Sequence, residues 1–177
     1  PIKMLTFNIY ALPHILAAVV LIFLGVYSLR NRFIPMAMPF ALLVLSAALW
    51  AVIYSLEICS GDLQLKVFWA KARFVGLAPL STLWLIVGIQ HGRFIRWFRG
   101  LRWAILAIVP VGAMLLSLTS GYHQLFRYDY SLVENRGLDL IAYKNGPLFW
   151  IYALYSYVMA GITGSLLYRS FKKRNTI

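Results

Sequence analysis

Five continuous apolar runs, each close to the roughly 20 residues that cross a bilayer as a helix, constrain the fold of this chain more than any other feature. They cover residues 10–29, 36–56, 67–89, 103–119 and 148–168. A membrane β-barrel would instead show shorter segments that alternate between apolar and polar residues. The runs therefore predict an all-α membrane protein, a bundle of five transmembrane helices that forms one domain over residues 1–177.

The formal net charge of +12 could indicate a nucleic-acid partner, but the distribution of charge argues against one. Basic residues cluster after the first, third and fifth runs, at Arg30 and Arg32, at Arg93, Arg96, Arg99 and Arg102, and at Arg169, Lys172, Lys173 and Arg174. All five acidic residues fall on the opposite side. Because positive loops stay inside, we expect the N-terminus outside, the C-terminus in the cytoplasm, and a multi-pass protein of the cell membrane that contacts lipid and binds no nucleic acid.

The longest connection between two runs, residues 120–147, carries the pattern of a β-hairpin. Apolar and polar side chains alternate over residues 126–144, around a turn at residues 134–137. An isolated hairpin is only marginally stable in water. We therefore expect a small extracytoplasmic hairpin whose tyrosine-rich face lies on the outer ends of the helices.

Prolines and small residues add two features to the helices. Pro79 and Pro110 lie inside the third and fourth runs, where each favours either a kink or a broken helix that lines a ligand site. Small residues in the fifth run, Ala160 and Gly164 among them, suit close helix packing. That face is the candidate contact of a homodimer.

A carboxylate stands at the end of the second run, where apolar chain meets water. Trp50, Tyr54 and Glu57 are spaced i, i+4 and i+7, so a helix places them on one face. A short loop makes the second and third helices antiparallel neighbours, and an ionisable group at membrane depth usually pairs inside the bundle. We therefore expect Glu57 to face a cation of the third helix. The candidates are Lys66, Lys71 and Arg73.

Each of these side chains also has a structural interpretation. Glu57 could form an ion pair or sit at a solvated helix end, and the tryptophans could belong to the aromatic belt of the membrane interface. His123 has no second histidine or cysteine nearby, so we expect no metal there, although it could sense protons. The functional interpretation is an outer ligand pocket. Its predicted lining is Trp50, Tyr54, Glu57, Trp69, Arg73, His123 and Trp150.

Catalytic motifs are missing from the sequence. It has no G-x-S-x-G, no H-E-x-x-H and no P-loop, and its one cysteine, Cys59, excludes an internal disulfide. We expect neither an enzyme nor a cofactor site in this chain.

Three motifs in a fixed order resemble a known family. The first is ALWAVIYSLEICSGDLQLKVFWAKARFVGLAPLSTLWLIVGIQHGR, residues 48–93, the second is TSGYHQLF, and the third is YKNGPLFWIYALYSY. Together they are similar to the N-terminal seven-helix domain of bacterial and archaeal sensor histidine kinases. The matching positions are Trp50, Tyr54, Glu57, Lys66, Phe68, Trp69, Lys71, Gly76, Pro79, His123, Phe126, Gly146, Pro147, Phe149 and Trp150.

This resemblance implies a membrane-embedded signal-input domain for an unknown stimulus. It also implies a cytoplasmic kinase or cyclase module, in cis or in trans, and a dimer. The sequence holds five of the family's seven helices, so a kinase module and further helices would lie outside it. The alternative is a small integral membrane subunit or a transporter, which would explain five helices without an effector.

Overall fold

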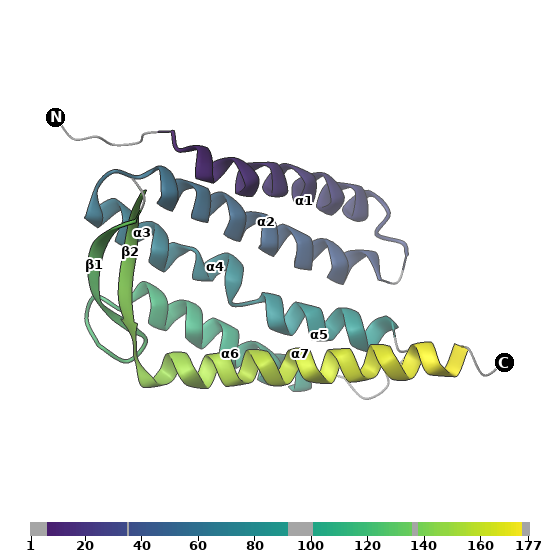
Figure 1. The fold of residues 1–177 in the computed structure, drawn as a ribbon. Coiled ribbons are helices and arrows are strands. Elements are labelled where there is room, and N and C mark those ends of the chain that lie inside the picture. The colour runs from purple at the N-terminus through teal and green to yellow at the C-terminus, as the bar shows by residue number, and fades with distance from the viewer. Residues whose placement is uncertain (1–6, 35, 92–100, 136–137, 175–177) are drawn as a thin grey trace.

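The chain folds into long apolar helices and one two-stranded sheet (Figure 1). The structure is a computed structural model that describes residues 7–34, 36–91, 101–135 and 138–174, with the backbone alone for 101–104, 135, 138, 173 and 174. The helices are α1 (Leu12–Arg30, after a short 3₁₀ turn Ile9–Ala11), α2 (Ala37–Cys59), α3 (Leu63–Ala72), α4 (Phe74–Leu77), α5 (Leu80–His91), α6 (Leu101–Leu118) and α7 (Pro147–Arg174). The strands are β1 (Arg127–Asn135) and β2 (Leu138–Asn145).

All five predicted apolar runs lie on helices. Among the described residues, four helical segments are long and apolar enough to cross a membrane: Ile9–Arg30, Ala37–Cys59, Leu63–His91 and Pro147–Lys172. The apolar part of α6, Ile105–Leu118, is shorter, so the fifth crossing stays a prediction. α1 begins at the end of the helices where the hairpin lies, and α7 ends at the opposite end (Figure 1).

The third span is interrupted twice. α3 ends at Ala72, Arg73 separates it from the single turn of α4, and Ala78 and Pro79 separate α4 from α5. Proline lacks a backbone N–H and clashes with the preceding turn, which explains the second interruption. Pro110 lies inside α6 without interrupting it. Of the two prolines singled out in the sequence, only Pro79 breaks its helix.

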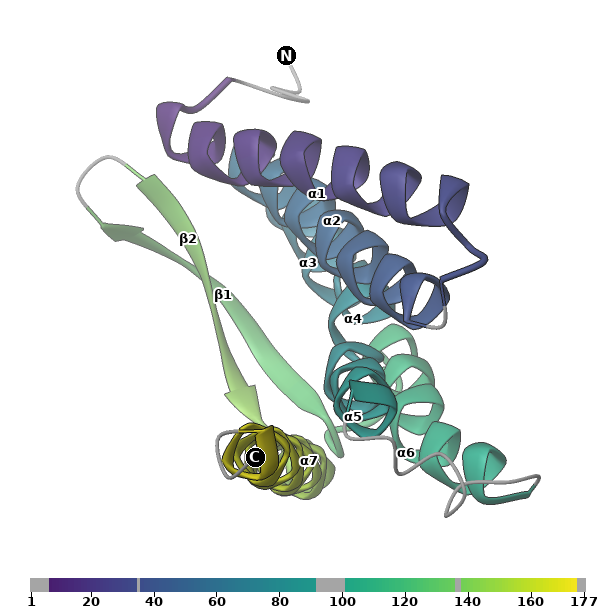
Figure 2. The same cartoon turned by 90° about the vertical axis from the view of Figure 1, so that its right-hand side faces the viewer.

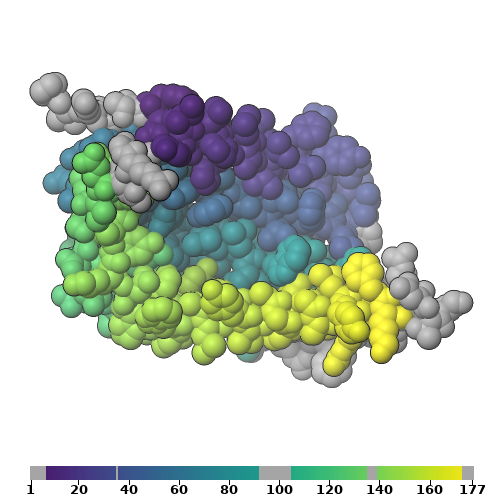
Figure 3. All heavy atoms as spheres, in the orientation of Figure 1, coloured from purple at the N-terminus to yellow at the C-terminus, as the bar shows by residue number. Residues whose placement is uncertain are grey.

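The helices follow one another along a curved layer. α2 packs against α1 on one side and against α3, α4 and α5 on the other, while α7 packs against α5 (Figure 2). At Gly76 the α4 backbone approaches α2 so closely that a Cβ atom would lie 2.5 Å from the backbone nitrogen of Trp50. The strands cover one end of the layer, as the space-filling view shows (Figure 3), and we refer to it as the hairpin end.

The predicted hairpin is confirmed, and it carries a bulge. β1 and β2 pair antiparallel, with a register shift between Tyr128 and Ser131. Asp129 adopts a φ of 58°, a left-handed conformation that aspartate tolerates better than most residues. An exposed ion pair joins Asp129 Oδ2 to Lys144 Nζ at 2.7 Å across the bulge. The tyrosine-rich face lies on the helices as expected, since Nζ of Lys71 on α3 lies 5.7 Å from the ring centroid of Tyr130. The Tyr130 hydroxyl also bonds Ser120 Oγ, just after α6, at 3.1 Å.

The close approach of Gly76 to the α2 backbone predicts that a larger residue there destabilises the fold. Gly76→Ala should lower the free energy of unfolding by about 1–3 kcal/mol, because the new methyl group meets backbone atoms that cannot rotate away. Gly112→Ala is the matched control on α6, where nothing lies within 4 Å of the added carbon. Titration with a denaturing detergent measures both variants. Equal stability of the two would contradict the packing described for α4.

Candidate functional site

A buried ion pair joins α2 to the interrupted third span. Nη1 of Arg73 lies 3.0 Å and 3.2 Å from the two carboxylate oxygens of Glu57, and both side chains are buried. Glu57 stands in the last turn of α2, and Arg73 occupies the interruption between α3 and α4. The predicted pairing of Glu57 with a cation of the third span is therefore confirmed, with Arg73 as its partner.

Aromatic rings enclose the guanidinium of Arg73. Its Nη2 donates a hydrogen bond to the Tyr143 hydroxyl at 3.0 Å, and its Cζ lies 5.4 Å from the ring centroid of Tyr54. Tyr54 in turn stacks on Trp50, with ring centroids 5.9 Å apart and an interplanar angle of 3°, and His14 packs edge-on against it at 4.8 Å. One cation therefore binds together α2, the third span and the hairpin strand β2.

Lys66 closes the turn between α2 and α3. Asp62 caps α3 by accepting hydrogen bonds from the backbone N–H groups of Gln64 and Leu65, at 3.0 Å and 3.3 Å. Lys66 follows one turn later and is buried, and its Nζ donates to the backbone carbonyl of Glu57 at 3.1 Å. The Glu57 carbonyl also accepts from the backbone N–H of Ser60 at 3.3 Å, so Lys66 is its second donor. A cation at this position complements the helix dipole at the end of α2.

A third buried cation comes from the hairpin. The guanidinium of Arg127 lies against three rings, with its Cζ 4.0 Å from the centroid of Tyr143, 4.6 Å from Phe74 and 5.0 Å from Phe149. Burial lowers the pKa of Arg127 to about 10, because desolvation penalises the charged form. It remains protonated at neutral pH, held by cation–π contacts rather than by a carboxylate.

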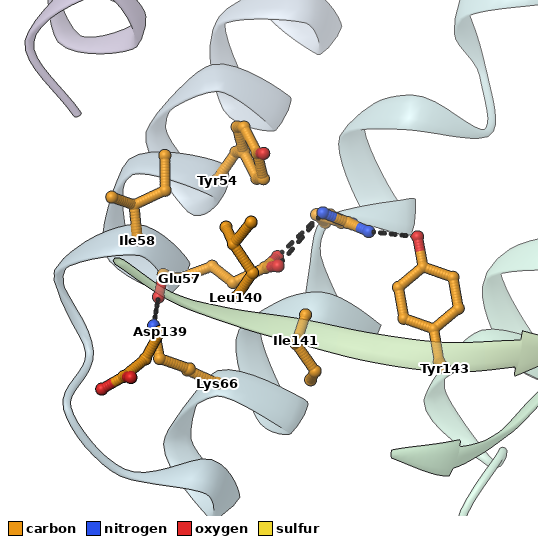
Figure 4. A pocket seen from close by; sticks show the side chains of 9 residues that line it. Tyr54, Glu57, Ile58, Lys66, Asp139, Leu140, Ile141 and Tyr143 are labelled. Atoms are coloured by element: carbon orange, nitrogen blue, oxygen red, sulfur yellow. Dashed lines mark hydrogen bonds and ion pairs between the residues drawn. The ribbon is translucent and has the colours of Figure 1, made fainter. Parts of the chain in front are cut away.

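These side chains surround a cavity of about 210 Å³ beneath β2 (Figure 4). Its floor comes from α2 and α3 and its cover from the hairpin. The lining residues are Tyr54, Glu57, Ile58, Lys66, Arg73, Asp139, Leu140, Ile141 and Tyr143. Figure 4 shows the Arg73 guanidinium between the Glu57 carboxylate and the Tyr143 hydroxyl, with dashed lines for the bonds to both. We refer to this space as the hairpin cavity.

Comparison with protein families identifies the chain. Residues 13–177 match the family described as the N-terminal 7TM region of histidine kinase. The chain belongs to this family. Neither the curated proteins nor the solved structures contain a match. The region is a membrane sensor region rather than a catalytic module, which agrees with the apolar spans and with the resemblance found in the sequence.

Only part of the predicted lining of this sensor region meets at the hairpin cavity. Tyr54, Glu57 and Arg73 line it, and Trp50 stacks behind Tyr54. Trp69 lies on α3 against Phe68, 4.9 Å between ring centroids, with its indole nitrogen buried and unbonded, and it does not line the cavity.

Trp150 and His123 also stand apart from the hairpin cavity. Trp150 is 63% exposed at the start of α7. His123 lines a second cavity of about 350 Å³ together with Lys71 and Tyr130, and its Nε2 lies 3.0 Å from the Thr119 hydroxyl. Burial raises the pKa of the Tyr130 hydroxyl in that cavity. The sequence grouped these residues because they share one end of the helices, whereas the structure places His123 after α6 and Trp150 on α7, away from the cavity between α2, α3 and β2.

Sequence reasoning missed the residues that the hairpin supplies. Tyr143 and Arg127 complete the surroundings of Arg73, and Asp139 stands at the exposed edge of the cavity. The alternation in strand β2 placed Asp139, Ile141 and Tyr143 on one face, which is the signal that could have located them. It could not say which face the hairpin turns toward the helices.

The buried pair predicts a large loss of stability when one partner is removed. Glu57→Leu should cost about 3–5 kcal/mol, because the Arg73 guanidinium is left buried without its carboxylate. The double variant Glu57→Leu with Arg73→Leu should recover much of this loss, since the Arg73 guanidinium is then no longer left buried without its carboxylate. Denaturing-detergent titration measures Glu57→Leu, Arg73→Leu and the double variant. The control Lys144→Gln, which breaks the exposed hairpin pair, should change stability little. Additive losses in the double variant would contradict direct coupling.

Proposed function

We propose that this sensor region receives its stimulus in the hairpin cavity and passes it to a cytoplasmic kinase or cyclase module, in cis or in trans. The observation that carries the proposal is the Arg73 junction, where α2, the interrupted third span and strand β2 meet on one guanidinium. A stimulus that binds there contacts three separate elements at once. It needs to differ in affinity between two helix arrangements by only a few kcal/mol to shift their populations.

A packed aromatic path leads from this junction to α7. Phe74 follows Arg73 directly and is fully buried, with its ring centroid 5.0 Å from Phe126 and 5.8 Å from Tyr152. The Tyr152 hydroxyl belongs to α7 and reaches the carbonyl of Leu77 at the end of α4, 3.4 Å away. α7 has 28 residues and so extends about 42 Å, to the end opposite the hairpin. A displacement of α4 is therefore transmitted to α7.

The orientation supports this direction of signalling. The positive-inside rule places the hairpin end outside and the end of α7 in the cytoplasm. Of the basic residues that predict the cytoplasmic side, the structure describes Arg30 and Arg169. Arg93, Arg96 and Arg99 lie outside the described residues. The cell membrane is the location that this topology favours.

Two further expectations remain proposals. The small-residue face of α7 is open, with nothing within 4 Å of a Cβ built at Gly161 or Gly164, and so it stays the candidate contact of a homodimer. A transporter is the second candidate function, because transporters use discontinuous helices and the third span is interrupted. Membership of a histidine-kinase sensor family favours the signalling role.

The signalling proposal predicts a change in kinase output. In membrane vesicles that contain the sensor region with its kinase module, Glu57→Gln should change the autophosphorylation rate about tenfold, which corresponds to about 1.4 kcal/mol of bias between two states. Lys144→Gln is the control, since that side chain lies at the surface of the hairpin. Unchanged output of both Glu57→Gln and Arg73→Ala under every tested stimulus would remove the hairpin cavity from signalling.

The topology predicts which loops an external reagent reaches. On a Cys59→Ser background, a membrane-impermeant maleimide should label Tyr122→Cys in intact cells and Phe33→Cys only after permeabilisation. Tyr122 is 95% exposed at the hairpin end, and Phe33 is 89% exposed in the turn between α1 and α2 at the other end. The reverse labelling pattern would show that the hairpin faces the cytoplasm.

A further inference from the structure

The charged side chains buried near the hairpin cavity do not balance. Among the described residues, four charged side chains are buried: the cations Lys66, Arg73 and Arg127, and the carboxylate of Glu57. Their net charge is +2. Buried charge is costly unless it is paired, and the three cations share a single buried carboxylate. The missing partner of this cluster is therefore negative.

Hydrogen-bond donors also outnumber acceptors at the cavity. Lys66 Nζ donates one bond, to a backbone carbonyl, and two of its three protons find no acceptor in the described part of the chain. The Tyr143 hydroxyl accepts from Arg73, and no described group accepts its own proton. The buried Nε of Arg73 is also without a partner. Each oxygen of Glu57 accepts one bond from Arg73 Nη1, so the one buried carboxylate is already paired while donors beside it stay unbonded. The cavity therefore favours a ligand that accepts hydrogen bonds.

The rest of the lining is apolar and small. Ile58, Leu140 and Ile141 supply aliphatic surface, and the ring of Tyr54 supplies an aromatic one. A volume of about 210 Å³ equals that of about seven water molecules in the liquid. Sites for drug-sized ligands usually exceed it, at roughly 300–1,000 Å³. The cavity therefore suits a short molecule with one polar end.

We propose that the hairpin cavity binds a small organic anion. Its carboxylate or phosphate oxygens accept from Lys66, Arg73 and Tyr143, and its apolar part contacts Leu140 and Ile141. Arg127 does not line the cavity but adds positive charge beside it, 4.0 Å from the ring centroid of Tyr143. This inference rests on the proposed function, because it names the chemical class of the stimulus. The anion comes either from the aqueous phase or from a lipid headgroup.

Asp139 determines the charge at the edge of the cavity. It lines the cavity but is exposed to solvent, so water screens its carboxylate and it compensates the buried cations only weakly. A cationic ligand would find only this screened carboxylate free, since the buried one is occupied by Arg73. An anion is therefore favoured, and Asp139 lowers its affinity.

The test uses three ligands of equal length and different charge. Calorimetric titration of the full chain in phosphatidylcholine nanodiscs compares hexanoate, hexanamide and hexylammonium. Hexanoate should bind at least about tenfold more tightly than hexanamide, because charge-assisted hydrogen bonds are roughly twice as strong as neutral ones. Nanodiscs that contain phosphatidylglycerol test the lipid source: competition with hexanoate assigns the site to a headgroup, and unchanged affinity assigns it to a soluble anion. Equal binding of hexanoate and hexanamide, tighter binding of hexylammonium, or no binding of hexanoate or phosphatidylglycerol overturns the proposal.

Matched variants locate the anion. Lys66→Gln should weaken hexanoate about tenfold, while Lys71→Gln removes the same charge from the same helix at the second cavity and should change affinity little. Asp139→Asn keeps the proposal testable if Lys66→Gln fails to fold, because its side chain is exposed. It should tighten hexanoate about two- to fivefold, as a nearby like charge is removed. Equal effects of the two lysine variants, or weaker binding to Asp139→Asn, would overturn the site.

Binding and signalling can fail separately. The titration contains no kinase module, so it reports on the anion site alone. Hexanoate binding that depends on Lys66, together with a kinase output that Glu57→Gln leaves unchanged, would retain the anion site and reject the signalling role of the cavity. An output that responds to Glu57→Gln without hexanoate or phosphatidylglycerol binding would do the opposite.

Discussion

The buried bond between Glu57 and Arg73 holds the hairpin end of the molecule together. It fixes the last turn of α2 against the interruption of the third span, and through Nη2 of Arg73 it also holds strand β2. A pair of this kind is expensive to desolvate, and its Coulomb energy offsets the cost only when further hydrogen bonds satisfy the remaining groups. Tyr143 supplies one such bond, and the ring of Tyr54 supplies a cation–π contact.

The same junction explains why a cavity survives beneath the hairpin. An apolar interior would close around a gap of this size, because unfilled space loses van der Waals contacts. Here the cations Lys66 and Arg73 must each keep their donors near acceptors, and the hairpin is held by Tyr143 and Arg127 rather than by a continuous apolar face. Charge and aromatic contacts therefore keep β2 at a distance from α2 and α3.

The sequence was informative about helices and pairing, and less so about the hairpin's contribution. Continuous apolar runs located the helices, and the i, i+7 spacing of Trp50 and Glu57 with a short following loop predicted an ion pair to the third span. No glycine or proline adjoins Arg73, so the sequence did not predict an interruption there, whereas Pro79 marks the second one. Tyr143 and Arg127 depend on the bulge near Asp129 and on how the hairpin rests on the helices, which is tertiary information that spacing along the chain does not contain.

The two interruptions divide the third span into three helical pieces, α3, α4 and α5. α4 is a single turn, and its backbone bonds to the flanking residues, with the Leu77 N–H donating to the Arg73 carbonyl at 3.0 Å and the Ala78 N–H to the Phe74 carbonyl at 2.9 Å. Its place is set from outside, by Arg73 at one end, by the close approach of Gly76 to α2, and by the buried ring of Phe74. In the signalling role that we propose, a change at Arg73 acts on this short segment, and the close packing of Phe74 on Tyr152 carries the movement into α7.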